Sequence, residues 1–336
     1  MRNLNFRQLV AQHPEILTDR HKLSFSNKNS PGETASALAG AGMVMLRGVF
    51  PPERLKESCE TFRRFTSALG KKDRESDARR NDNVLGLDDG PNSEWDNGES
   101  ESGSWHPPWV VQHLGHFPTV IILAELIKSW AWPVIERICD STDIVVMFGL
   151  CLARHRIDEE LFIGVHQDVT AVNPEIPLSI WIPLDEAAPG RHSGLGFIAP
   201  APDHALPAGA NNDVGQDYLL NNLGKAWVPH YHAGDLTIHS KFSPHFTTGY
   251  GTQSDRYSLE IRLWARTDEL SKYCDPSIRI SRRNGVPVVV ETKCSPGVGA
   301  HGFLACAALH AMQAASSPSE WHRAPLSRAV MERSEQ

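Results

Sequence analysis

The sequence predicts a mainly β fold with flanking helices, whose core is a double-sheet barrel of the jelly-roll type. Eight short apolar segments with turn residues between them follow Asp143. Helix-like apolar spacing occurs before and after these segments, and the segment Arg256–Trp264 alternates polar and apolar side chains. Many short strands at this spacing are typical of sandwiches and barrels rather than of βαβ units.

The N-terminal part of the chain is expected to supply helices, one strand and a loop. Residues 1–40 are mixed in composition and are expected to be partly helical, and Gly42–Phe50 has the pattern of a short buried strand. The apolar spacing of residues 52–69 and of residues 117–139 predicts a helix in each. Between them, residues 71–110 are dominated by charged residues, Asn, Gly and Ser, which indicates either a surface loop or an active-site lid.

The barrel strands are expected within residues 143–266. In chain order they are Ile144–His155, Ile163–Val172, Leu178–Leu184, Leu195–Ile198, Trp227–Tyr231, Leu236–Ser240, His245–Thr248 and Tyr257–Trp264. Residues 267–336 form a C-terminal extension, in which Gly302–Ala315 is expected to be one more helix.

The bulk properties allow a sizeable core and argue against several classes of protein. The 336 residues are 40% hydrophobic and 22% charged, which is an ordinary globular balance. A formal net charge of −7 argues against a nucleic-acid-binding protein. No apolar run approaches the ~20 residues of a membrane span, and the first residues lack an apolar signal segment. The six cysteines are scattered without a C-x-x-C pair, as in proteins with reduced thiols, so we expect a cytoplasmic protein.

One pattern of residues indicates metal chemistry. His166 and Asp168 form an H-x-D pair in a predicted strand, and His245 begins another strand far along the chain. Side chains two positions apart on a strand share a face, so this imidazole and carboxylate can bind the same ion. His245 would complete a 2-His-1-carboxylate set, which suits non-haem Fe(II) with coordination positions left open. The same three ligands could also bind Zn²⁺.

The predicted strand at residues 256–264 has two different faces. One face carries Arg256, Ser258, Glu260 and Arg262, and the other carries Tyr257, Leu259, Ile261 and Leu263. Such alternation predicts that the apolar face packs on a core or helix layer while the polar face lines a polar space. Arg256 and Ser258 could clamp a carboxylate, because a guanidinium is a planar two-pronged donor. The alternative is a solvated face with an ordinary Glu260–Arg262 ion pair, and the nearby histidine motif favours the clamp.

Together these residues resemble the Fe(II)/2-oxoglutarate-dependent dioxygenases, and among them the phytanoyl-CoA dioxygenase family. The matching segments are the H-x-D pair, Leu178–Asp185, Ser193–Pro200 with His204, Gly234–Ser240, His245, and Arg256 with Ser258. Their order and spacing agree over residues 143–266. Where many relatives have P-G-S-H, this chain has Ala199–His204, a departure that leaves the substrate open.

The resemblance implies a double-stranded β-helix, the cupin-like form of the jelly roll, with Fe(II) held by His166, Asp168 and His245. It also implies 2-oxoglutarate and O₂ as cosubstrates, with release of succinate and CO₂. Related halogenases lack the carboxylate ligand, so its presence implies hydroxylation or a related oxidation such as desaturation, cyclisation or epoxidation. The implied contacts of 2-oxoglutarate are Arg256 at its distal carboxylate, with Ser258, Thr247 and Trp181.

The other histidines are expected to have minor roles. His239 lies inside a predicted strand, and its separation from Arg256 is too long for the distal ligand of the family. His192, His230 and His232 lie near predicted turns or strand ends and are expected to be ordinary polar residues.

We therefore expect one catalytic domain over residues 1–336, with helices, first strand and lid at 1–142, the jelly-roll core at 143–266 and an extension at 267–336. Its expected function is hydroxylation of a small organic molecule. A secondary metabolite is favoured over a fatty acyl-CoA, because no basic cluster marks a CoA phosphate site. Two alternatives stay open, a Zn²⁺-dependent hydrolase or lyase on a cupin-like barrel and a non-catalytic relative. The oligomeric state is not predicted.

Overall fold

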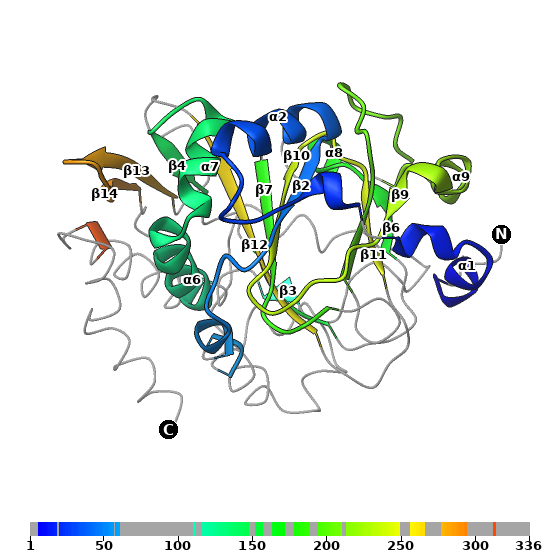
Figure 1. Cartoon of the computed structure of the whole chain (residues 1–336), viewed down its shortest axis with the longest axis horizontal. Coiled ribbons are helices and arrows are strands. Elements are labelled where there is room, and N and C mark those ends of the chain that lie inside the picture. The colour runs from blue at the N-terminus through cyan, green and yellow to red at the C-terminus, as the bar shows by residue number, and fades with distance from the viewer. Residues whose placement is uncertain are drawn as a thin grey trace.

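The computed structural model contains two facing β-sheets with helices on the outer side of the larger one (Figure 1). The described residues are 6–18, 20–56, 58–60, 110–111, 116–147, 152–156, 163–171, 178–187, 194–209, 213–248, 256–265, 277–293 and 312–313. The predicted loop or lid at 71–110, except its last residue, and all but two residues of the predicted helix Gly302–Ala315 lie outside this part of the chain.

The large sheet contains ten of the described strands. They are β1 (Ser24–Phe25), β2 (Met43–Leu46), β3 (Val110–Val111), β4 (Ile144–Val146), β5 (Leu152–Arg156), β7 (Leu178–Pro183), β10 (Leu236–Ser240), β12 (Arg256–Trp264), β13 (Ser277–Arg283) and β14 (Val286–Lys293). Their order is β1-β2-β10-β7-β12-β4-β13-β14, with β5 also beside β12 and β3 beside β5.

The small sheet has four described strands in the order β6-β11-β8-β9. They are β6 (Ile163–His166), β8 (Gly194–Ile198), β9 (Ala226–Trp227) and β11 (His245–Thr248). The strands from β5 to β12 therefore pair as β5-β12-β7-β10 in one sheet and β6-β11-β8-β9 in the other, and all these pairs are antiparallel. This double-sheet, eight-strand arrangement confirms the predicted jelly-roll, or double-stranded β-helix, core.

Helices pack on the outer face of the large sheet. The described helices are α1 (Phe6–Gln12), η1 (Pro14–Leu17), η2 (His21–Leu23), α2 (Pro31–Ala41), α6 (His116–Lys128), α7 (Ala131–Cys139), α8 (Asp168–Ala171), α9 (Gln216–Asn221) and η7 (Leu223–Lys225), and residues 52–56 and 58–60 are also helical. Helices α2, α6 and α7 lie on one side of the large sheet (Figure 1). Their apolar side chains form one core cluster with the outer face of the sheet. None of the described helices combines the length and apolar character that crossing a membrane requires.

Strand β12 shows why the barrel has a polar interior. Leu259 and Ile261 pack into the core under the helices. The alternate side chains, which include Ser258, Glu260 and Arg262, are also buried, at most 4% exposed. The two faces predicted for this strand are present, and the polar face lines the space between the sheets instead of facing solvent.

The predicted helix at residues 117–139 is wrong, because two helices, α6 and α7, occupy this range. The interruption lies at Ser129, whose hydroxyl donates to the Leu126 carbonyl at 2.7 Å and accepts from the N–H of Ala131 at 3.2 Å. Pro133 then falls in the first turn of α7, where its missing N–H costs no helical hydrogen bond.

The single strand predicted over Ile144–His155 is also wrong, because β4 and β5 are separate. Both pair with β12, with Val146 opposite Leu263 and Leu152 opposite Glu260. Six positions separate Val146 from Leu152, whereas three separate their partners Leu263 and Glu260 on β12, so one continuous register cannot include both pairs. The strand predicted over Trp227–Tyr231 is shorter in the structure, where β9 ends at Trp227.

Candidate metal centre

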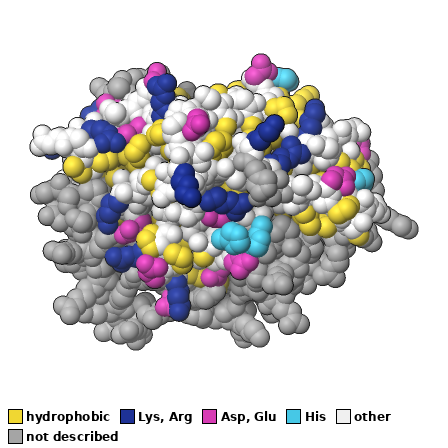
Figure 2. All heavy atoms as spheres, viewed as in Figure 1, with side chains coloured by type: hydrophobic (Ala, Val, Ile, Leu, Met, Phe, Trp, Pro, Cys, Tyr) yellow, Lys and Arg dark blue, Asp and Glu magenta, His cyan; other side chains and the backbone are white. Residues whose placement is uncertain are grey.

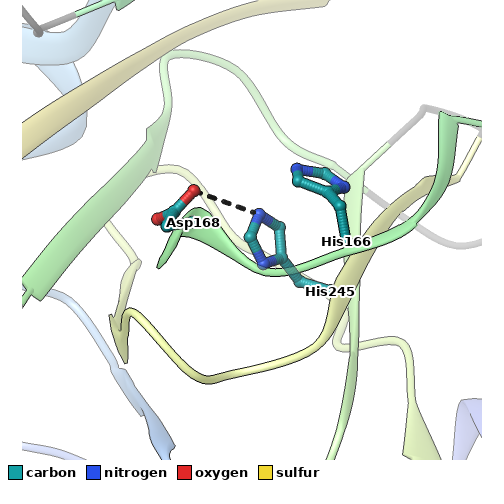
Figure 3. A group of neighbouring side chains, drawn as sticks. All are labelled: His166, Asp168 and His245. Carbon is teal, nitrogen blue, oxygen red and sulfur yellow. Dashed lines mark ion pairs between the residues drawn. The ribbon is translucent and has the colours of Figure 1, made fainter. Parts of the chain in front are cut away.

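The structure brings together the three side chains that the sequence predicts as metal ligands. His166 ends β6, Asp168 begins α8 and His245 begins β11. His245 lies directly opposite His166 in the antiparallel pair of β6 and β11, with ring centroids 4.2 Å apart. One ligand atom from each of the three residues lies within 4.8 Å of the others. Figure 3 shows the Asp168 carboxylate and the His245 ring turned toward each other, with the His166 ring beside them.

Backbone carbonyls fix the orientation of both imidazoles. Nδ1 of His166 lies 3.0 Å from the Gly164 carbonyl oxygen, and Nδ1 of His245 lies 3.0 Å from the Ser243 carbonyl oxygen. Because a carbonyl oxygen only accepts, each Nδ1 carries the hydrogen and each Nε2 presents a lone pair. Histidines that bind metal ions are usually held in this way through their second ring nitrogen.

Asp168 does not lie on a strand, so the prediction of one strand over Ile163–Val172 is wrong. Strand β6 ends at His166, since its partner β11 begins opposite it at His245 and no described segment continues the ladder. The chain turns into α8 at this point. The carboxylate of Asp168 approaches the imidazoles through that turn, with Oδ1 3.9 Å from Nε2 of His245, and not along one face of a strand.

The large sheet holds the other oxygen of the Asp168 carboxylate. Ser179 on β7 donates its hydroxyl hydrogen to Oδ2. Nη1 of Arg262 on β12 lies 3.3 Å from the same oxygen and donates to the Ser179 hydroxyl at 2.7 Å. Nη2 of Arg262 lies 3.4 Å from Oδ1. These contacts fix the carboxylate so that Oδ1 is the oxygen nearer the imidazole of His245.

The electrostatic surroundings keep Asp168 ionised. Burial by itself raises the pKa of this carboxyl group. The positive charge of Arg262 is the largest of the effects that outweigh burial and hold the pKa of Asp168 well below its usual range. The carboxylate is therefore in the form that a metal ligand requires.

The imidazole of His245 is held in its neutral form. Burial, and next the neighbouring imidazole of His166, lower the pKa of His245 to about 3 against the opposing effect of the Asp168 carboxylate. The ring therefore carries no charge at physiological pH. Its Nε2 lone pair is then available to a metal ion without loss of a proton.

His239 on β10 lies in the same barrel interior, although only a minor role is expected for it from the sequence. Its side chain is fully buried, with Nε2 3.5 Å from Oδ2 of Asp168 and its ring centroid 4.8 Å from that of His245. Asp168, His239 and Glu260 form a second group with metal-ligand spacing. Arg262 contacts both carboxylates of that group, and its guanidinium would repel a metal ion there. The group with His166 is therefore the better candidate for a metal site.

Of the four residues predicted to contact 2-oxoglutarate, the structure describes the side chains of three. Trp181, Thr247 and Ser258 are buried on β7, β11 and β12. The hydroxyl groups of Ser258 and of Thr237 on β10 have no hydrogen-bond partner among the described residues. Buried hydroxyls of this kind are costly unless a polar ligand completes them. The backbone of Arg256 begins β12, and its side chain is outside the described part of the structure.

Gln167 is a site residue that the sequence reasoning missed. It lies between two ligands of the predicted metal site and is fully buried. Its Nε2 donates to the carbonyl oxygens of Phe242 at 2.6 Å and His204 at 3.2 Å, and its Oε1 accepts from the N–H of Leu206 at 2.7 Å. Gln167 therefore ties the residues before His245 and the segment after β8 to the candidate metal centre. In the sequence, the only sign of this role is that an uncharged amide stands between two predicted ligands.

No protein-family model matches this chain, and no curated protein matches it. Among solved structures, it is similar to the epimerase SnoN crystallised with Fe3+, alpha ketoglutarate and nogalamycin RO, at 14% identity over 75% of this chain and 86% of that chain, with a TM-score of 0.47. The apo non-heme monooxygenase ThoJ is 10% identical over 89% of this chain and 99% of its own, with a TM-score of 0.49. AviO1 from Streptomyces viridochromogenes Tue57 is 13% identical over 71% and 97%, with a TM-score of 0.48. These identities and TM-scores are too low to indicate the function of this chain.

Proposed function

We propose that this protein is an Fe(II)- and 2-oxoglutarate-dependent dioxygenase that hydroxylates, or otherwise oxidises at an unactivated C–H bond, a small organic molecule. The observation that carries the proposal is the pair of imidazoles, each held through Nδ1, beside an ionised carboxylate inside a jelly-roll barrel. Two imidazoles and one carboxylate leave coordination positions open and suit non-haem Fe(II). When bound, iron, 2-oxoglutarate and O₂ supply the C–H oxidation, with release of succinate and CO₂.

In this proposal His166, Asp168 and His245 hold the metal ion, and their neighbours fix how they do so. The carbonyls of Gly164 and Ser243 hold the two rings, so that Nε2 of each faces the ion. On the carboxylate, Oδ2 is engaged by the large sheet and Oδ1 is presented to the ion. Ligands held in this way need little rearrangement when the ion binds, which favours binding.

We assign the distal carboxylate of 2-oxoglutarate to Arg256 and Ser258. Ser258 shares with Glu260 and Arg262 the face of β12 that lines the interior, and Arg256 lies two positions before Ser258 in the same strand. The buried hydroxyl of Ser258 lacks a described partner, as expected for a group that completes its hydrogen bonds with a ligand. Thr247 and Trp181, which are buried on neighbouring strands, complete the proposed contacts.

Production of succinate is the direct test of the proposed reaction. The wild-type protein should convert 2-oxoglutarate to succinate with Fe(II) and O₂, and His166→Ala, Asp168→Ala and His245→Ala should lower this to the background rate. His13→Ala is the matched control, because His13 is a partly exposed histidine that pairs with Glu15. Wild-type turnover in any of the three variants would refute the assigned ligands.

The cosubstrate assignment has its own test. Arg256→Ala should raise the KM for 2-oxoglutarate by at least about tenfold, because loss of one good charged hydrogen bond costs roughly 1.5–3 kcal/mol. Calorimetric titration of 2-oxoglutarate into the Mn(II)-loaded variant should show the same loss of affinity. An unchanged KM and affinity would remove Arg256 from the proposed site.

The proposal extends to the family, the number of domains and the class of substrate. We place the chain near the phytanoyl-CoA dioxygenase family, as one catalytic domain acting on a secondary metabolite in preference to a fatty acyl-CoA. Turnover of a substrate that depends on Zn²⁺ and is indifferent to 2-oxoglutarate would instead identify the alternative, a cupin-type hydrolase or lyase.

A further inference from the structure

Glu186, His230 and His232 form a second cluster of metal-binding side chains, on the outside of the barrel. One ligand atom from each lies within 4.8 Å of the others, and all three residues are exposed. Nε2 of His230 lies 2.7 Å from Oε1 of Glu186, and the two imidazole centroids are 4.4 Å apart. Figure 2 shows histidine side chains gathered with acidic ones on the viewed face of the molecule.

The backbone explains why these three side chains meet. Ala187 and Tyr231 form an antiparallel bridge, with N–H to carbonyl distances of 3.1 and 2.9 Å. Side chains alternate along an extended chain, so His230 and His232 share the face opposite to Tyr231. Tyr231 is fully buried in the interior cluster, which turns both imidazoles outward. Glu186 precedes the bridge residue Ala187 and is exposed on the same side.

The segment that carries the two imidazoles is held in place before any ion binds. Asp235 accepts hydrogen bonds from the N–H of His232 through Oδ2 and from the N–H of Gly48 through Oδ1, each at 2.8 Å. Arg47 donates to the same carboxylate at 2.8 Å and to the carbonyl of His230 at 2.6 Å. The charge of Arg47 is thus balanced by Asp235. A fixed backbone lowers the entropy that ligand ordering costs on binding.

We propose that Glu186, His230 and His232 form a second metal site, which binds a divalent transition-metal cation of the Zn²⁺ type with water completing the coordination. Two imidazoles and one carboxylate are a recurrent ligand set for Zn²⁺. Around a tetrahedral ion with bonds of ~2.0–2.2 Å, ligand atoms lie roughly 3.3–3.5 Å apart. The hydrogen-bonded His230–Glu186 pair therefore has to open by less than about 1 Å, which exposed side chains achieve by rotation.

The position of the cluster assigns a structural role to the bound ion. Glu186 follows β7, and the two imidazoles precede β10, which is the neighbour of β7 in the large sheet. An ion held by all three side chains joins the ends of these strands across the Ala187–Tyr231 bridge. It stabilises the folded chain by mass action, because it binds the folded form in preference to the unfolded one.

The number of Zn²⁺ ions bound per chain tests this site. Equilibrium dialysis of the full chain against Zn²⁺ should show one equivalent less for His232→Ala and for Glu186→Gln than for wild type, while His13→Ala matches wild type. This difference does not depend on whether the interior site also binds Zn²⁺, because all four proteins retain His166, Asp168 and His245. Equal stoichiometry in wild type and His232→Ala would overturn the proposal.

A second readout locates the ion. Zn²⁺ should still raise the thermal midpoint of His166→Ala, which lacks a ligand of the interior site, and the rise should be smaller in His232→Ala than in wild type. Anomalous diffraction from Zn²⁺-soaked crystals should place a peak between His230 and His232. A midpoint shift in His232→Ala as large as in wild type, or no anomalous peak at the cluster, would contradict the assignment.

Discussion

Arg262 contacts both carboxylate oxygens of Asp168, with Nη1 3.3 Å from Oδ2 and Nη2 3.4 Å from Oδ1. The same guanidinium donates to Glu260, the residue two positions earlier on β12. One buried guanidinium therefore contacts two buried carboxyl groups, since all three side chains are at most 5% exposed. Charges interact strongly in such an interior, so these contacts affect both stability and the shape of the candidate metal centre.

Arg262→Met should destabilise the fold, because it leaves two buried carboxylates without their cation. We expect the metal-free protein to lose roughly 3–5 kcal/mol of unfolding free energy, the usual cost of breaking a buried ion pair from one side. The double variant Glu260→Gln/Arg262→Met removes one of the stranded charges and should recover part of that loss. Urea denaturation of the three proteins measures this. A double variant less stable than the single one would contradict the account.

Ser179→Ala tests the role of the hydroxyl that holds Oδ2 of Asp168. We expect metal affinity to fall by about 10–100-fold, as for other groups that orient a metal ligand, while the fold stays intact. Ser277→Ala is the matched control, because Ser277 is also a buried serine in the large sheet and its hydroxyl has no hydrogen-bond partner among the described residues. Titration with Fe(II) under anaerobic conditions measures both. Equal affinities in the two variants would show that Ser179 does not position the carboxylate.

Substitution of His239 and of His245 distinguishes between the two groups of candidate metal ligands, which share Asp168. If the ion lies with His166, Asp168 and His245, His245→Gln should abolish tight Fe(II) binding, and His239→Gln should reduce it by no more than about 100-fold through the contact with Oδ2 of Asp168. Both side chains are buried in the same interior, so each variant controls for the packing effect of the other. If His239→Gln lowers Fe(II) affinity more than His245→Gln does, the metal ion lies instead with Asp168, His239 and Glu260.

Gln167→Ala should loosen the link between the metal centre and its neighbouring segments. It removes a donor to two carbonyl oxygens and an acceptor for the N–H of Leu206. Each buried group left without a partner costs about 1–3 kcal/mol, so a loss of stability in that range or above is expected. Gln167→Glu keeps the acceptor and removes the donor, so hydrogen exchange at Leu206 should be faster in Gln167→Ala than in Gln167→Glu. Equal exchange in both variants would exclude the link.

The eight-strand core could be predicted because each strand is a short apolar or alternating segment bounded by turn residues. The bounds Leu236–Ser240 and His245–Thr248 agree with β10 and β11. The hairpin of β13 and β14 was not predicted, although Asn284-Gly285 is the strongest short-range hairpin signal. Both residues adopt positive φ, 52° and 78°, as that turn requires.

The metal centre could be predicted only as a list of ligands. The H-x-D spacing and a distant histidine identify His166, Asp168 and His245 as candidates that can meet. The neighbours that orient Asp168 come from β7, β10 and β12, which are adjacent in the sheet and far apart in the chain. No local pattern relates Ser179 to Arg262, because their contact arises from strand order.

Gly196 and Gly194 on β8 form a matched pair for the last prediction. A Cβ atom at Gly196 would overlap the ring of Phe246, which lies opposite it on β11, whereas a Cβ at Gly194 would meet Ala187 at an ordinary 3.6 Å. Phe246 is fully buried in the core cluster outside the small sheet and follows His245 directly.

Gly196→Ala should therefore cost about 1–3 kcal/mol, as overpacking does, and should lower metal affinity, because any shift of Phe246 moves the backbone of His245. Gly194→Ala should leave both properties close to wild type. Adding Phe246→Leu to Gly196→Ala makes room for the new methyl group, so the two changes together should cost less than the sum of their separate effects. Strictly additive losses in urea denaturation would show that Gly196 is not required by the ring of Phe246.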